Sequence, residues 1–170
     1  MIKAFCAAVF VASCLVPAVH AQIAAPACPA TGTIDELVKA LDDAVSGPAD
    51  KDRTCLHELI LPEGRLIPMS KGPDGKLAPK VLTVDDWINR VKARGHEVLH
   101  ERQVKYSVDT YGQIAHLWST YELHLSSDDK TTIRGINSIQ AVYDGAQWKV
   151  IEILWKAEGP SEPVPQKYLP

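Results

Sequence analysis

The spacing of apolar residues changes once along this chain, and that change most constrains the fold. Before Gly95 apolar residues recur at three- and four-residue spacing, and beyond it they alternate every second residue. The first pattern is typical of amphipathic helices and the second of strands with one buried face. We therefore predict an α+β protein, with helices first and then four strands at about 101–109, 114–126, 131–143 and 147–156.

Three helices are predicted in the first half. Thr33 and Glu36 form a capping box at the start of the first helix, and Gly47 follows its end. A shorter helical segment covers about residues 55–60. Thr83 caps the third helix. We expect these helices to pack on one face of a strongly curved, mainly antiparallel sheet.

The first 21 residues have the order of a secretory signal peptide. Lys3 precedes an apolar run, and Val19-His20-Ala21 has the form of a cleavage site. A run of about 13 apolar residues is too short to span a bilayer, which takes roughly 20. We expect an exported protein, periplasmic or secreted, without a membrane span. The lesser alternative is a lipoprotein tethered at Cys14, since residues 11–14 resemble a lipobox.

Export would leave two cysteines, Cys28 and Cys55, in a compartment that permits disulfides. A bond between them would close a loop of about 28 residues and stabilise the fold by roughly 3–4 kcal/mol on the chain-entropy model. It would also tie the extended leader, residues 22–32, to the second helix. Two free thiols are the alternative.

The rest of the chain is the size of one domain, about 150 residues. The formal net charge of −3 for the whole chain and the scattered basic residues do not suggest nucleic-acid binding. Residues 33–157 form the predicted domain. The tail from 158 to 170 is rich in proline and is expected to be an extended strap.

The string His96-Glu97-Val98-Leu99-His100 matches the H-E-x-x-H pattern of zinc sites. That chemistry needs the two histidines one helical turn apart, but here they follow Gly95 and lead into a strand. On a strand, residues four apart are separated by roughly 13 Å, too far to share one metal. We therefore predict no metal site. Because export makes cytoplasmic cofactors poor candidates, we also predict no cofactor.

Residues 114–125 divide their side chains between two faces, one apolar and one mixed. An exposed Trp118 between two histidines would be unusual. One hypothesis makes the mixed face, with His116, Trp118 and Thr120, the lining of a ligand pocket. The other hypothesis, given equal weight on these residues, places that face in solvent.

The turn at Asp144-Gly145 decides which residues of the last two strands share a face. If Ala146 also belongs to the turn, apolar residues group together and Asn137 joins Trp155. We favour this register. A buried Asn137 would then need a hydrogen-bond partner or a ligand. The residues predicted to share the face are Asn137, Ile139, Ile151, Ile153 and Trp155.

The order of elements and three strings resemble the nuclear transport factor 2-like superfamily, in particular its SnoaL-like and DUF4440-type bacterial branch. The strings are residues 114–122, 134–140 and 148–150. The resemblance implies a cone-shaped fold around a cavity and, commonly, a homodimer through the outer sheet face. It covers about residues 33–157.

Members of this superfamily include enzymes and binding modules, so the fold alone does not select a function. The isomerase-like pattern has a carboxylate in the stretch that matches residues 64–69, where this chain has no acid. The second acid of that pattern aligns near Ile139 of this chain. The leading hypothesis is therefore a small-molecule-binding protein whose cavity is lined by His116, Trp118, Thr120, Asn137 and Trp155. The alternatives are a cofactor-free lyase, isomerase or hydrolase with His116 as acid or base, and a structural dimer with a filled cavity.

Overall fold

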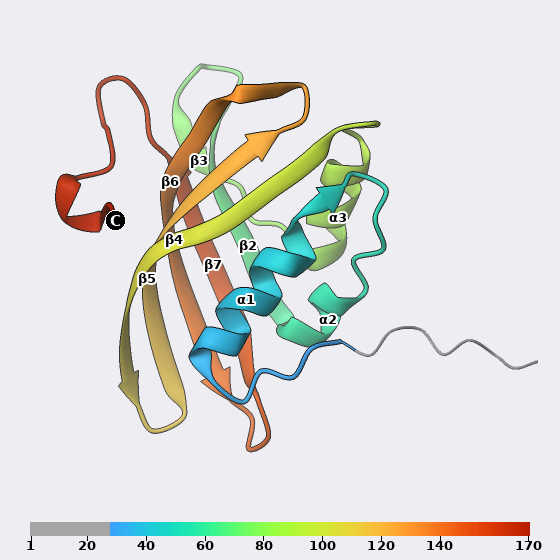
Figure 1. Ribbon diagram of the computed structural model, residues 1–170, viewed down its shortest axis with the longest axis vertical. Helices are drawn as coiled ribbons and strands as arrows, with labels where there is room; N and C mark the ends of the chain where they lie inside the picture. Colours follow the sequence, from blue (N-terminus) through green and yellow to red (C-terminus); the bar gives the residue numbers. More distant parts are fainter. Residues whose placement is uncertain (1–27) are drawn as a thin grey trace, which may run out of the picture.

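The computed structural model describes residues 28–170. The predicted signal peptide, the alternative at Cys14 and most of the leader lie outside the described residues. Figure 1 shows helices on one side of a sheet, and the C-terminal segment on the other. The elements are α1 (Ile34–Val45), β1 (Gly47–Pro48), α2 (Cys55–Leu59), β2 (Ile60–Lys71), β3 (Leu77–Pro79), α3 (Val84–Lys92), β4 (Val98–Tyr111), β5 (Ile114–Leu125), β6 (Asp128–Tyr143), β7 (Trp148–Ala157) and the 3₁₀ turn η1 (Gln166–Tyr168).

The helix starts agree with the capping signals in the sequence. The Thr33 hydroxyl accepts a hydrogen bond from the Glu36 amide at 3.2 Å, and the Glu36 carboxylate accepts one from the Thr33 amide at 2.9 Å. Thr83 and Asp86 repeat this arrangement at α3. Each reciprocal pair satisfies amide groups that a helix start leaves without partners. The predicted starts of α1 and α3 are confirmed.

The strands form one mixed sheet in the order β1-β4-β5-β6-β7-β2-β3. All neighbours are antiparallel except β2 and β7, which are parallel. The predicted α+β class and mainly antiparallel sheet are confirmed. The prediction of a strongly curved sheet is not: the strands twist across the sheet without strong curvature (Figure 1).

The hairpin of β6 and β7 places four of the five residues on the predicted face, although residues 144–147 form its connection and its register differs from the favoured one. Asn137 lies opposite Trp155 and Ile139 opposite Ile153. A bulge between Gln140 and Ala141 then shifts the register, so that Ala141 pairs with Val150. Ile151 falls at this bulge and is 40% exposed, which corrects its predicted place on the buried face.

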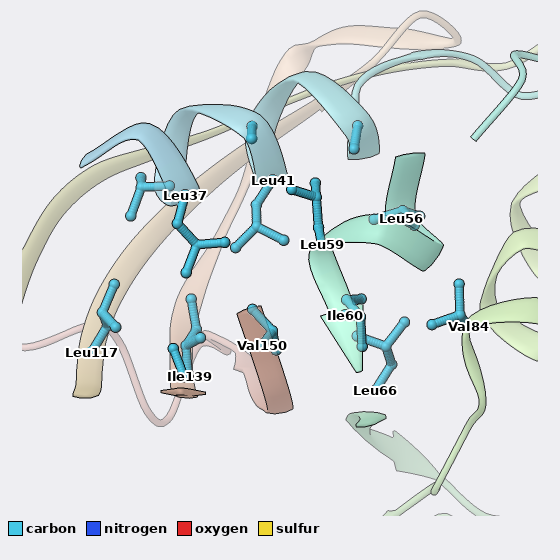
Figure 2. Close-up of a cluster of buried hydrophobic side chains, with 14 of the residues drawn as sticks. Leu37, Leu41, Leu56, Leu59, Ile60, Leu66, Val84, Leu117, Ile139 and Val150 are labelled. Atoms are coloured by element: carbon cyan, nitrogen blue, oxygen red, sulfur yellow. The ribbon is translucent and has the colours of Figure 1, made fainter. Parts of the chain in front are cut away.

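The core lies between the helices and the inner face of the sheet, meaning the face toward α1, α2 and α3. Figure 2 shows Leu37 and Leu41 of α1 pointing toward Leu117 and Ile139 of the sheet. Leu117 is fully buried and Ile139 is 1% exposed. At about 25 cal/mol per Å² of apolar surface, such side chains supply most of the stability of the fold.

A disulfide joins Cys28 to Cys55, as predicted. The bond fixes the segment before α1 to the start of α2. Beside it, the Thr31 hydroxyl donates a hydrogen bond to the Trp148 carbonyl oxygen at 2.7 Å. Among residues 28–170, no helix has the length and apolarity that crossing a membrane requires.

Candidate functional site

A cavity of about 150 Å³ lies between the three helices and the inner face of the sheet. Most of its lining is apolar, and a smaller polar part comes from α1, β4 and β6. This combination is typical of a small-molecule site. The lining residues are Leu41, Asp42, Val45, Leu56, Ile60, Leu66, Trp87, Val91, Arg94, Leu99, Glu101, Gln103, Leu123, Asn137, Ile139, Ile153 and Trp155.

The structure separates the five residues predicted to line one pocket. Asn137 and Trp155 do line the cavity. His116, Trp118 and Thr120 lie on the outer face of the sheet, because their neighbours Leu117 and Ser119 point inward and are fully buried. Strand residues one apart point to opposite faces, so one strand cannot turn both sets inward.

The C-terminal tail covers part of the outer face. The rings of Trp118 and Tyr168 lie 5.9 Å apart, and the Thr120 hydroxyl donates to the Tyr168 carbonyl oxygen at 2.6 Å. Lys105 donates to the Leu169 carbonyl oxygen, also at 2.6 Å. A second, largely apolar hollow of about 380 Å³ lies beneath this tail. The tail covers Trp118 only in part, and this side chain stays 37% exposed on the outer face.

A network of polar side chains closes one end of the cavity. The Gln103 backbone amide and side-chain amide both donate to the Asp42 carboxylate, at 3.0 and 3.2 Å. The Gln103 side-chain oxygen accepts from the Ser119 hydroxyl at 2.5 Å and from the Asn137 amide at 3.1 Å. Asn137 is 6% exposed, and this contact supplies the partner that its burial requires.

Glu101 carries the largest electrostatic perturbation in the cavity. The pKa of its carboxyl is raised to about 7, mainly by burial and in addition by the nearby Asp42 carboxylate, while the hydrogen bond from Gln103 acts in the opposite direction. Burial also raises the pKa of Asp42, against the hydrogen bonds from Gln103. A carboxyl that titrates near neutrality exchanges protons readily under ordinary conditions.

No motif marks Asp42, Glu101 or Gln103 in the sequence, and none of them was predicted as a site residue. A signal for them does exist. Glu101 and Gln103 alternate with the buried Leu99 on one strand, and Asp42 stands at helical spacing from the buried Val38. Polar residues that interrupt an apolar face in this way are candidates for a buried site.

The H-E-x-x-H string is not helical. His96 lies in the turn after α3, and β4 begins at Val98. Glu97 accepts hydrogen bonds from the Ser126 and Ser127 hydroxyls, at 2.9 and 2.6 Å. Across residues 28–170, no group of three or more His, Cys, Asp or Glu side chains is placed to hold a metal ion.

Comparison with known proteins identifies the fold. No family model and no curated protein sequence matches this chain. Solved structures do match at low sequence identity. One is a nuclear transport factor 2-like protein of unknown function from Shewanella baltica, with 13% identity, a TM-score of 0.51, and coverage of 74% of this chain and 90% of the other.

Two further structures agree with it. A protein from Kribbella flavida has 12% identity and a TM-score of 0.56, and the match covers 74% of this chain and 88% of the other. A putative calcium/calmodulin-dependent kinase II association domain from Exiguobacterium sibiricum has 12% identity, a TM-score of 0.52 and the same coverage. The chain therefore has the nuclear transport factor 2-like fold.

Proposed function

We propose that this chain is an exported protein that binds a small, partly apolar molecule in the cavity between the helices and the inner face of the sheet. One observation carries the proposal: a largely apolar cavity of about 150 Å³ is lined in part by a hydrogen-bonded network of half-buried and buried polar side chains. An apolar cavity of about this volume is large enough for a benzene ring. The polar end would fix the orientation of the bound molecule.

Titration with benzyl alcohol, followed by calorimetry, tests the binding. Leu123→Trp places a larger side chain in the cavity lining and is expected to abolish binding. Trp118→Ala, on the outer face, is the control and should leave the affinity unchanged. Equal binding by both variants, or a loss only in Trp118→Ala, would place the site elsewhere.

A second function is favoured by Glu101: proton transfer on a small molecule without a cofactor. A carboxyl with a pKa of about 7, buried at the end of a cavity, has the properties of a general base or acid. Glu101 would then be the acid or base, the role that the sequence suggested for His116, because His116 lies on the outer face. Exchange of the α-protons of cyclohexanone in D₂O, followed by NMR, tests this function. Glu101→Gln should remove the exchange, and His116→Ala should retain it.

Three sequence predictions become part of the proposal. Export is supported by the N-terminal pattern and by the Cys28–Cys55 bond, and N-terminal sequencing of the mature protein tests it against cleavage before Cys14. Membership of the SnoaL-like and DUF4440-type branch is supported by the three strings that resemble it. A homodimer through the outer sheet face is tested by light scattering of the purified protein.

A further inference from the structure

The polar end of the cavity offers acceptors rather than donors. The Gln103 side-chain oxygen already accepts two hydrogen bonds, and its amide donates to Asp42. The Asn137 side-chain amide also donates to Gln103, which leaves its oxygen as a further acceptor in the cavity lining. The carboxyl oxygens of Glu101 and the remaining lone pairs of Asp42 are acceptors as well. A molecule that satisfies this end must supply hydrogen-bond donors.

The formal charges of the lining residues also favour a ligand that supplies hydrogen-bond donors. Asp42 and Glu101 are both acidic and both half-buried. Arg94 is the only basic residue of the lining, and it is exposed just beyond the end of α3. Arg102 offsets the charge of Asp42 in part, whereas no cation acts on Glu101 among the described residues, and burial of that carboxylate is costly because it removes hydration. A cation brought by the ligand would remove part of that cost.

We propose that the cavity selects a small apolar amine, whose ammonium group lies between the Asp42 and Glu101 carboxylates while its hydrocarbon body packs against Trp87, Trp155 and the aliphatic lining. This inference rests on the proposed binding function and names its ligand class. The Asn137 oxygen supplies a further acceptor for the ammonium, which has three donor hydrogens. The cavity volume limits the body to about one ring and a short arm.

Proton linkage follows from this arrangement. The titratable and charged groups around Glu101 are Asp42 from α1, Tyr121 from β5 and Arg94 after α3, and Arg102 of β4 acts on Asp42. Burial raises the pKa of Tyr121 above its usual range, so it stays neutral. An ammonium beside Glu101 favours its ionised form, so binding should release a proton near neutrality. Affinity should rise about tenfold between pH 6 and pH 8, as Glu101 ionises.

Calorimetry with three probes of one shape tests the proposal: benzylamine, benzyl alcohol and benzoate. Benzylamine is expected to bind at least tenfold more tightly than benzyl alcohol at pH 8, and benzoate least of all. Equal affinities for the amine and the alcohol would overturn the amine preference while leaving cavity binding intact. If no probe binds, both the preference and the proposed function fail.

Variants separate a charge effect from a structural one. Asp42→Asn and Glu101→Gln keep the shape of each side chain, and each should reduce benzylamine affinity about tenfold while changing benzyl alcohol affinity much less, because the alcohol carries no charge. Glu101→Gln should also remove the pH dependence. The matched control is Asp43→Asn, because Asp43 lies on the same helix but is exposed and paired with Lys39. A loss of benzylamine affinity in Asp43→Asn equal to that in Asp42→Asn would overturn the proposal.

Discussion

The inner and outer faces of the sheet differ in how their charged side chains are paired. On the outer face Glu122 is paired with Arg134 at 2.7 Å, and Lys156 is paired with Glu162 of the tail. On the inner face the Gln103 amides and the charge of Arg102 offset the burial of Asp42 only in part, Gln103 alone offsets that of Glu101, and the pKa values of both carboxyls are raised. Paired charges contribute to a structural surface, whereas carboxyls with raised pKa values are a cost that function would explain.

The largest contrast is expected between neighbouring residues of β5. Leu117→Ala removes a fully buried side chain from the inner face and should lower the free energy of unfolding by about 2–5 kcal/mol. His116→Ala, one residue away on the outer face, should change it by less than about 0.5 kcal/mol. Urea unfolding of both variants measures the contrast. Similar losses would mean that both faces are packed alike.

Glu101 and Glu122 should respond to neutralisation with opposite signs. The folded-state pKa of Glu101, about 7, lies above its usual 4.5, so the folded state binds this proton more tightly than the unfolded state does. Stability is therefore lost as the pH rises from 4.5 to 7. Glu101→Gln should be more stable than the unmodified protein by up to roughly 3 kcal/mol at pH 8, with no gain at pH 4.

Glu122→Gln provides the comparison for that experiment. It breaks the ion pair with Arg134 and should lower stability at pH 8. Unfolding by urea at pH 4 and pH 8 gives both differences. A stability loss in Glu101→Gln at pH 8 would show that this carboxyl has a stabilising partner in the folded protein.

The smallest effect on stability is expected for a substitution in the C-terminal tail. Tyr168→Ala removes the ring that packs on Trp118 and should cost about 1 kcal/mol. Because Trp118 then becomes more exposed, its fluorescence should shift to longer wavelength. Benzyl alcohol binding should not change, since the tail lies across the sheet from the cavity. A weaker affinity in this variant would connect the tail to the site.

The fold was more predictable than the site because it depends on patterns that repeat. The capping box at Thr33 and the alternation in β5 are local signals, and each was read correctly. The face of β5 that points inward depends on what covers each side. The sequence pattern favoured Trp118 as a pocket residue because it does not show that the ring of Tyr168, fifty residues later, packs against it.

Two further features depend on tertiary structure. Neither Val150 nor Glu152, the sequence neighbours of Ile151, is a turn residue that would mark the bulge, so the alternation alone places Ile151 inward. The sequence pattern alone would likewise place Glu101 in solvent, because acidic side chains are normally exposed. Asp42 and Glu101 are recognised as a pair only from the tertiary structure, in which Asp42 of α1 lines the same cavity as Glu101.

The claim that the inner cavity is the binding site can be tested directly by NMR. Benzyl alcohol is titrated into uniformly ¹⁵N-labelled protein, and the shifts of the backbone amides are followed. The account predicts that the largest shifts fall on residues 99–103 of β4 and on Asn137 and Ile139 of β6. Shifts concentrated on residues 116–120 and 164–168 would contradict it, because they would place the ligand beneath the tail on the outer face.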